Sequence, residues 1–408
     1  MKDALLIHLD YCLTPSTRIN NAAIVIRDHR ILAVGGYSAF VHPENYDIIE
    51  MSDCYAIPGF IDTHISGAGR FDCMRAATEP NFNAMSTALA EHGVSSFLPT
   101  THTSSHKHLL EVIETLSRKT DDYSLPGAVP IGFHIDGPFV SHAKRGSHEE
   151  RYIAPIDLGL AKEMIQTGRD KVRVFTFAPE LAHSIELTEL LCEHNISPCM
   201  GHSIAGEQDV LRAVEAGANR CLHLYNGMAP LEQRKVGLAA ISMVDERIWV
   251  EIIPDGVHSH WGMMELACRC KSRSKTVAIS NATEAAGLPD GKYHLGDRVI
   301  NVQHGRSTLE DGTIAGSTSF LDQNYRNLLE HTEMSQEEAA ACCSLNAALS
   351  IGETDRGRIK PGKRADLVIL DKKNHEVQMT IVNGRLAYSR MDKTQLINQS
   401  TGGGQLVY

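Results

Sequence analysis

The chain lacks three features that would each point to a particular class of protein. No window reaches the roughly 18 consecutive apolar residues of a membrane-spanning helix, and His8 and Asp10 interrupt the N-terminal stretch MKDALLIHLDYCLTPS. No run of basic residues is present, and the 10 cysteines include no CxxC pair. These absences argue against a membrane protein, a nucleic-acid-binding protein and a zinc knuckle.

The composition is that of an ordinary globular protein. The 408 residues are 42% hydrophobic and 22% charged, which suffices for a large core and a smaller unit. The 50 acidic residues outnumber the 39 basic ones, so the formal charge is -11 and most of the surface would repel a polyanion. A small anionic substrate remains compatible if a few basic side chains converge. We expect a soluble, cytoplasmic protein with reduced thiols.

The two ends of the chain share one pattern. Residues 1–55 are short apolar segments separated by turns, which is typical of β structure, and the pattern returns in ADLVILD and MTIVNGRLAY. The Asn-Gly pair in the second segment predicts a hairpin turn. We expect residues 1–55 and 353–395 to build one small β-sandwich domain, followed by a flexible tail over 396–408.

Between these ends, over residues 56–352, apolar strands, polar loops and amphipathic helices repeat, for example the predicted helix GEQDVLRAVEAGA (206–218). The predicted strands are AIPGFIDTHIS (56–66), VSSFLPTTHT (94–103), VPIGFHIDGPF (129–139), VRVFTFAPE (172–180), ISPCMGHS (196–203), RCLHLYNGM (220–228), WVEIIPDGVH (249–258) and TVAISNAT (276–283). Eight such units predict an α/β protein with a (β/α)8 barrel. A doubly wound sheet is the competing fold, but no GxGxxG follows the first strand.

Polar side chains stand at the ends of these strands, where a barrel of this kind carries its catalytic groups. They are His64, Ser66, His102, His134, Asp136, His202, His223, Asp255, His258 and Asn281. A single histidine would usually be a hydrogen-bonded core residue. Several at the same relative position favour a divalent metal site, because imidazoles and a carboxylate are the ligands that zinc takes.

Several ordered blocks of this sequence resemble a known family. They are PGFIDTHISGAG, HIDGPFVSHAKRGSH, FAPE, MGHSIA, EAGANRCLHLYNGMAPL, DGVHSH, AAGLPDGKYHLG, DGTIAGS and PGKRADLVILD. Over almost its whole length the chain resembles the N-acetylglucosamine-6-phosphate deacetylases of the amidohydrolase superfamily. The resemblance implies a homodimer in which a metal-activated water attacks the acetamide of an amino-sugar 6-phosphate, releasing acetate and the amine.

The resemblance places the metal ligands at Asp136, His202 and His223. The family usually has glutamate where Asp136 stands, so the ion must lie closer to the strand or accept a longer bond. His64-Ile65-Ser66 matches the His-x-His pair that supports a second metal in some members. Because Ser66 is a poor ligand, we expect one divalent ion, zinc, with His64 as a further candidate ligand.

The substrate-binding residues are implied in the same way. The phosphate would lie near Arg234 and the backbone amides of Asn226 and Gly227, a combination suited to phosphate. His258 would polarise the acetyl carbonyl, and His148 resembles a sugar-contacting histidine. Without the resemblance, Arg234 in LEQRK would be taken for an ordinary surface arginine.

Asn281 departs from the family in its catalytic group. SNA stands here where the family has a pattern resembling TDA, and the family aspartate takes a proton from the attacking water and gives it to the leaving nitrogen. An amide side chain cannot do this. We expect deacetylation to be slowed by roughly a hundred to ten thousand-fold, while substrate still binds.

Three explanations of this departure stay open. Asn281 is an engineered replacement; or Ser66, Asp136 and Asn281 diverged together and the chain runs another reaction on a related sugar phosphate; or His64 or Asp255 has assumed the proton transfer. A non-catalytic sugar-phosphate binder is a separate hypothesis. Both the glucosamine and the galactosamine epimer remain candidate substrates.

Overall fold

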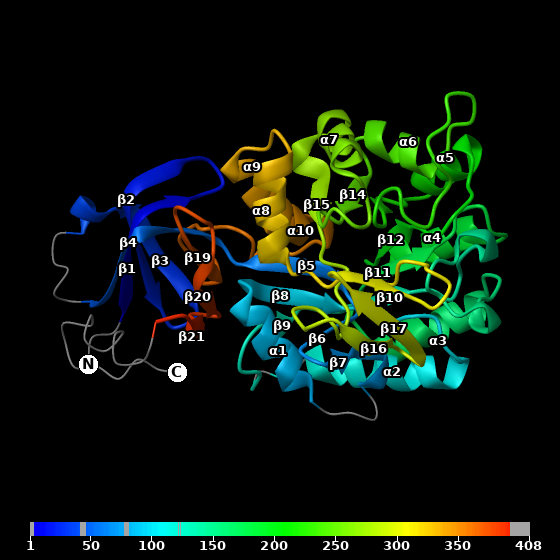
Figure 1. Ribbon diagram of the computed structural model, residues 1–408, viewed down its shortest axis with the longest axis horizontal. Coiled ribbons are helices and arrows are strands. Elements are labelled where there is room, and N and C mark those ends of the chain that lie inside the picture. Colours follow the sequence, from blue (N-terminus) through cyan, green and yellow to red (C-terminus); the bar gives the residue numbers. More distant parts are fainter. Residues whose placement is uncertain (1–3, 41–45, 77–80, 121, 123, 392–408) are drawn as a thin grey trace.

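The computed structural model describes residues 4–40, 46–76, 81–120, 122 and 124–391. A parallel barrel forms its larger part, with a smaller sheet beside it (Figure 1). The barrel strands are β5 (Phe60–Ile65), β8 (Val94–Pro99), β9 (Val129–Pro130) with β10 (Phe133–Asp136), β11 (Val172–Phe177), β12 (Ser197–Met200), β13 (Arg220–Cys221), β14 (Trp249–Ile252) and β15 (Thr276–Ala278). Each lies within one predicted segment, β9 and β10 together forming the third strand, so the (β/α)8 prediction is confirmed.

The barrel closes through contacts that join its parallel sheets. One sheet is β5-β8-β9 and the other runs from β10 to β15. A bridge between Thr100 and His134 connects them on one side. On the other side, the Asn281 N–H donates to the His64 carbonyl at 3.1 Å. The first and last strand ends, far apart in sequence, therefore lie side by side at the mouth.

Helices cover the outside of the barrel. They are α1 (Phe82–Glu91), α2 (His106–Thr120), α3 (Leu158–Gly168), α4 (Ser184–Glu193), α5 (Glu207–Glu215), α6 (Leu238–Val244), α7 (Trp261–Cys270), α8 (Leu321–His331), α9 (Gln336–Cys343) and α10 (Leu345–Ser350). In α2 the buried Leu109, Val112 and Leu116 recur at the helical period, which gives an apolar stripe toward the strands. The predicted helix over 206–218 is confirmed as α5. Across the described residues, no helix is long and apolar enough to cross a membrane.

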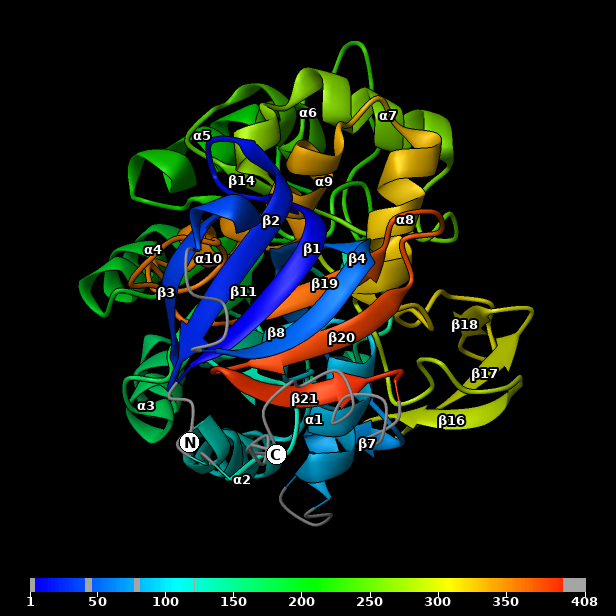
Figure 2. The same cartoon turned by 90° about the vertical axis from the view of Figure 1, so that its left-hand side faces the viewer.

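The two ends of the described chain contribute strands to one seven-stranded sheet. Its order is β21-β20-β19-β4-β1-β2-β3, with β1 (Leu5–Leu13), β2 (Arg18–Arg27), β3 (Arg30–Gly36), β4 (Asp47–Pro58), β19 (Leu367–Asp371), β20 (Val377–Val382) and β21 (Arg385–Ser389). Figure 2 shows the N-terminal and C-terminal strands side by side. Asn383 and Gly384, both at positive φ, form the predicted hairpin turn between β20 and β21. The predicted tail over 396–408 lies outside the described residues.

An antiparallel excursion leaves the barrel after β15. It consists of β16 (Gly291–Leu295), β17 (Arg298–Gln303) and β18 (Arg306–Thr308). Elsewhere, two antiparallel strands of two residues each, β6 (Gly67–Ala68) and β7 (Phe71–Asp72), follow β5. The excursion has a small core of its own that includes Ile300 and Val302. The sequence patterns did not predict this excursion. Leu295 from its first strand lines the pocket at the barrel mouth.

Candidate active site

A pocket opens at the C-terminal ends of the barrel strands. Its lining includes His64, Ser66, His102, Asp136, His202, His223, Asn226, Gly227, His258 and Asn281, together with Leu295, Thr313 and Ile314 from the excursion and the segment after it. Most of the predicted strand-end residues are thus brought together, as the barrel predicts.

Six imidazole rings form a continuous row through this site. Neighbouring ring centroids lie 4.0 Å apart for His102 and His148, 4.4 Å for His148 and His202, 4.8 Å for His202 and His223, 6.1 Å for His223 and His64, and 4.9 Å for His64 and His134. Packing alone does not require so many buried imidazoles, because apolar side chains fill a core at a lower free-energy cost.

His202 and His223 have the arrangement of two ligands of one metal ion. The Nδ1 of His202 lies 2.8 Å from the Lys144 carbonyl, so an Nδ1–H donated there leaves the Nε2 lone pair free. The two Nε2 atoms are 3.1 Å apart, close to the roughly 3.3 Å between two nitrogens that bind one tetrahedral zinc at about 2.0–2.1 Å. Burial lowers the pKa of His202 to about 4 and that of His223 well below its usual value, so both rings are neutral at pH 7.

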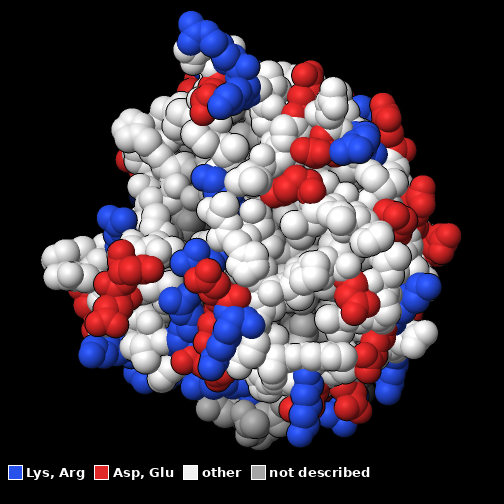
Figure 3. All heavy atoms as spheres, turned by 90° about the vertical axis from the view of Figure 1, so that its right-hand side faces the viewer, with Lys and Arg blue, Asp and Glu red and all other residues white. Residues whose placement is uncertain are grey.

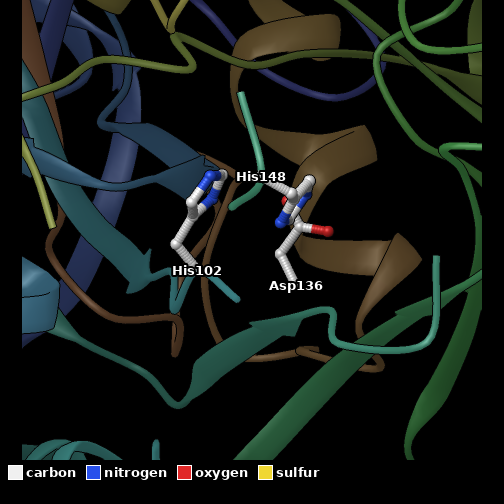
Figure 4. A group of neighbouring side chains, drawn as sticks. All are labelled: His102, Asp136 and His148. Atoms are coloured by element: carbon white, nitrogen blue, oxygen red, sulfur yellow. The ribbon is translucent and has the colours of Figure 1, made fainter. Parts of the chain in front are cut away.

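Asp136 supplies the negative charge of the site. Burial alone would raise the pKa of Asp136, but the positive charge of His148 and then of His202, in their protonated forms, outweighs burial and lowers that pKa well below the usual range. A buried carboxylate among imidazoles is a good place for a cation. Within the described residues, the group whose ligand atoms all lie within 4.8 Å of one another is His102, Asp136 and His148 (Figure 4). The donor set therefore fits a divalent ion, and the short Asp136 side chain lies toward His148.

The backbone at three residues of the pocket is unusual. His202, His223 and Asn281 have φ values of 47°, 26° and 51°, in the left-handed region that non-glycine residues rarely adopt. Gly227 adjoins His202 so closely that an added Cβ would lie 2.8 Å from its Nδ1. Such strain, held in place by the surrounding structure, is common where side chains must be aimed at a ligand.

His258 and Asp255 form a second polar unit beside Asn281. The Nδ1 of His258 lies 2.7 Å from Asp255 Oδ2, and the Asp255 Oδ1 accepts the backbone N–H of His258 at 2.9 Å. The Nε2 of His258 then lies 3.4 Å from the Asn281 Nδ2. The carboxylate orients the ring, and the ring presents its other nitrogen to the pocket.

The residues predicted to contact the substrate lie in different surroundings. His148 is fully buried, and its Nδ1 lies 2.6 Å from Thr103 Oγ1. Arg234 is exposed and is not part of the pocket lining. The Asn226 N–H donates to the His223 carbonyl at 3.0 Å, so it is not available to a phosphate in this arrangement. Gly227 does line the pocket.

Sequence reasoning gave no role to several residues that the site contains. The sequence places His102 at a strand end without assigning it a role, and it offers Asp255 as one candidate for the proton transfer without predicting its contact with His258. Thr103, which orients His148, gave no signal. Leu295 and Thr313 come from a region whose approach to the pocket depends on the tertiary fold.

Comparisons with known proteins agree with this geometry. Residues 55–387 match the Amidohydrolase family. The chain is 33% identical over 399 residues to N-acetylglucosamine-6-phosphate deacetylase of Bacillus subtilis (strain 168), covering 97% of this chain and 100% of the relative. It is 32% identical over 361 residues to N-acetylgalactosamine-6-phosphate deacetylase of Escherichia coli O157:H7, covering 88% and 95%.

Solved structures give the same picture. N-acetylglucosamine-6-phosphate deacetylase from Thermotoga maritima is similar with a TM-score of 0.83 and 32% identity, covering 94% of this chain and 99% of that one. A mutant of the Mycobacterium smegmatis enzyme, in complex with N-acetyl-D-glucosamine-6-phosphate, has a TM-score of 0.88 and 27% identity, covering 95% and 100%. The barrel, the strand-end histidines and these full-length matches together show that the chain belongs to the amidohydrolase family.

Proposed function

We propose that this protein hydrolyses the acetamide of an N-acetyl amino-sugar 6-phosphate to the amine and acetate, in a metal-dependent reaction. The observation that carries the proposal is that the His202–His223 pair and His258, which Asp255 orients, line one pocket. The full-length relatives that act on N-acetylglucosamine 6-phosphate and N-acetylgalactosamine 6-phosphate give the substrate class and keep both epimers as candidates.

We propose zinc as the ion, held by His202, His223 and Asp136. Two neutral imidazoles and a carboxylate suit zinc better than magnesium or calcium. A divalent ion there would polarise the amide carbonyl and raise the acidity of a nearby water.

Two further residues of the chain, His258 and Asn281, lie where the substrate and its protons would be. His258 points its Nε2 into the pocket; with its Nδ1–H donated to Asp255, the imidazolium form of the ring has a second N–H, at Nε2, that can stabilise charge developing on the acetyl oxygen. Asn281 holds the place of a general acid-base but can only donate or accept hydrogen bonds. Its backbone is tied at both ends, since its N–H donates to His64 and its carbonyl accepts the Ser317 N–H at 2.7 Å. The position is therefore rigid, and only the side chain limits proton transfer.

The proposed assembly is a cytoplasmic homodimer with a barrel over 56–352 and a small β domain from both ends. All ten cysteines are free, which suits a reducing compartment. Apolar side chains lie exposed near α5 and α6, namely Leu231 at 38%, Val236 at 43% and Val244 at 72%. On the face shown in Figure 3, a broad uncharged area extends from the middle to the right, and charged side chains of both signs cluster to its left as well as along the edge. Sedimentation of the Val236→Lys, Val244→Lys double variant as a monomer would support this dimer surface.

Amine release from N-acetylglucosamine 6-phosphate tests the function. The zinc-loaded protein should react slowly, and the Asn281→Asp variant should gain roughly a hundred-fold or more, the usual size of general acid-base catalysis. Asn281→Ala, which also removes the amide but adds no acid, is the matched control and should gain nothing. The galactosamine epimer is assayed alongside.

A non-catalytic sugar-phosphate binder is the second candidate, favoured by the amide at position 281. It predicts tight binding of the sugar phosphate in calorimetry and no amine even from Asn281→Asp. That result would contradict the deacetylase proposal.

A further inference from the structure

Three buried side chains converge beside the His202–His223 pair without satisfying one another. His102 follows β8, Asp136 ends β10 and His148 lies on the loop after β10; they are 9%, 3% and 0% exposed. In the described part of the chain, His102 Nε2, Asp136 Oδ1 and His148 Nε2 are all buried polar atoms that lack a hydrogen-bond partner. Each such atom is costly to bury unpaired, so the two imidazole nitrogens without partners beside this carboxylate indicate a missing ligand.

The geometry of the group suits a cation better than a hydrogen bond. The His148 Nε2 lies 3.6 Å from Asp136 Oδ2, too far for a hydrogen bond but near the roughly 3.3 Å that separates two ligands of a tetrahedral ion. If the Nδ1–H of His148 is donated to Thr103 Oγ1, the Nε2 lone pair faces the carboxylate. Two electron-rich atoms then face each other, which a cation between them would stabilise.

The backbone preserves this arrangement. Gly137, at a φ of 82°, passes so close to the Thr103 side chain that an added Cβ would lie 2.3 Å from Thr103 Oγ1. A glycine there lets His148 and Thr103 stay in contact beside Asp136. A hydrogen-bond acceptor behind a histidine ligand is the usual way in which proteins fix the ring nitrogen that binds metal, and Thr103 Oγ1 can accept from His148 Nδ1.

We propose that His102, Asp136 and His148 bind a divalent cation of the zinc class, at a site separate from the His202–His223 pair. Two imidazoles and one carboxylate select zinc, cobalt or nickel over calcium and magnesium. Asp136 has an oxygen for each site, since Oδ2 faces His148 and Oδ1 lacks a partner within the described residues. The carboxylate would then bridge two ions.

This second position differs from the one that His64 and Ser66 would provide. The His64 Nδ1 lies 3.2 Å from His134 Nδ1, and His64 is outside the group whose ligand atoms converge. The His102 and His148 rings are stacked with 9° between their planes. Since a ring nitrogen binds metal in the plane of its ring, the His102 ring must turn relative to the His148 ring, which Thr103 holds in place, when both bind one ion.

Zinc binding without substrate tests the proposal, so its outcome is independent of the proposed deacetylation. Metal-free wild type, His102→Gln, His64→Gln and the surface control His106→Gln are titrated with zinc by calorimetry, and bound zinc is counted by elemental analysis. We expect His102→Gln to bind one zinc ion fewer than wild type, while His64→Gln and His106→Gln bind as wild type does. Anomalous diffraction at the zinc edge should show an ion between His102, Asp136 and His148.

Thr103→Val is a milder variant that keeps all three ligands. Loss of the hydroxyl that orients His148 should weaken this one ion by roughly ten- to a hundred-fold. Urea unfolding of the metal-free variants checks their folding. If His102→Gln proves to be unfolded, zinc binding by Thr103→Val decides the outcome. The proposal is overturned if His102→Gln and Thr103→Val bind zinc with unchanged number and affinity, or if the ion is lost from His64→Gln and kept in His102→Gln.

Discussion

Strands β13 and β14 lead to buried polar residues at both ends of the barrel, and the two sets differ in how far their hydrogen bonds are satisfied. At the bottom, Arg220 and Glu251 are fully buried and joined by a 2.6 Å contact between Nη1 and Oε1. Arg220 Nη2 also donates to the Ser350 carbonyl at 3.0 Å, and its Nε lies 3.4 Å from Ser197 Oγ. Every guanidinium nitrogen of Arg220 thus has a partner, although Glu251 Oε2 has none in the described part of the protein.

At the mouth, by contrast, the same strands lead to His223 and the Asp255–His258 unit. The Nδ1 of His223 is buried without a partner among the described residues, and its Nε2 lies 3.1 Å from the Nε2 of His202. The comparison teaches how to tell two kinds of buried polarity apart. Polar groups that satisfy each other stabilise the fold, whereas groups left unmatched around a pocket are kept for a ligand.

Replacing a histidine at the barrel mouth should have the largest effect, a loss of activity with little change in stability. In the Asn281→Asp background, His223→Asn should lower amine release by about a thousand-fold, because metal polarisation is worth several kcal/mol. The free energy of unfolding of the metal-free protein should change by at most about 1 kcal/mol. Assays and urea unfolding measure the two effects, and a variant that keeps its activity would show that His223 is not a ligand.

Replacing one partner of the Arg220–Glu251 pair at the bottom of the barrel should lower stability and leave activity unchanged. Glu251→Gln leaves Arg220 as a buried charge without its counter-ion, so the free energy of unfolding should fall by about 3–5 kcal/mol. Zinc content and the kcat of the folded fraction should stay unchanged. The exposed Glu246→Gln is the control in urea unfolding, and a loss of kcat without loss of stability would reverse the assignment.

Asp255→Asn should have an intermediate effect on activity. The Asp255 carboxylate accepts from His258 and, at 3.0 Å, from Ser317 Oγ, so an amide would leave the His258 ring poorly oriented. We expect kcat to fall by roughly ten- to a hundred-fold with zinc content unchanged. Ser317→Ala, which removes only the hydroxyl, should cost less; equal losses would mean that orientation of His258 is not the cause.

The same aspartate should give the smallest effect, a pH dependence of stability. Burial raises the pKa of Asp255, but the hydrogen bond and charge of His258 outweigh burial and hold that pKa below its usual value. Ionised Asp255 therefore stabilises the fold above about pH 4, and this contribution is lost as the pH falls through its depressed pKa. The difference in unfolding free energy between wild type and Asp255→Asn, about 1–3 kcal/mol near neutrality, should shrink in urea titrations below about pH 4. A constant difference would contradict this sign.

Much of the fold could be predicted because its signals are local. The strand-helix alternation, the α5 helix and the Asn383-Gly384 hairpin follow from periodicity and turn chemistry over short windows. The β16–β18 excursion was missed, since its strands are short and half exposed and its packing depends on contacts with the barrel.

The candidate site was predicted in its residue types and strand ends, but less well in its contacts. His148 and Arg234 occur in the expected blocks, yet one lies buried against Thr103 and the other is exposed. Loop conformation decides the direction of such side chains, and no periodicity in the sequence encodes it.

The sequence by itself determined the barrel, its family and the gathering of histidines at one mouth, because hydrophobic period and strand count force the strand ends to meet. Only the tertiary structure decided which of these side chains face each other. Asp136 is one methylene shorter than the glutamate of the family, and this short carboxylate lies beside His148 and His102. Distances of a few ångströms between residues far apart in the chain settle which atoms can share an ion, and these distances arise only when the barrel closes.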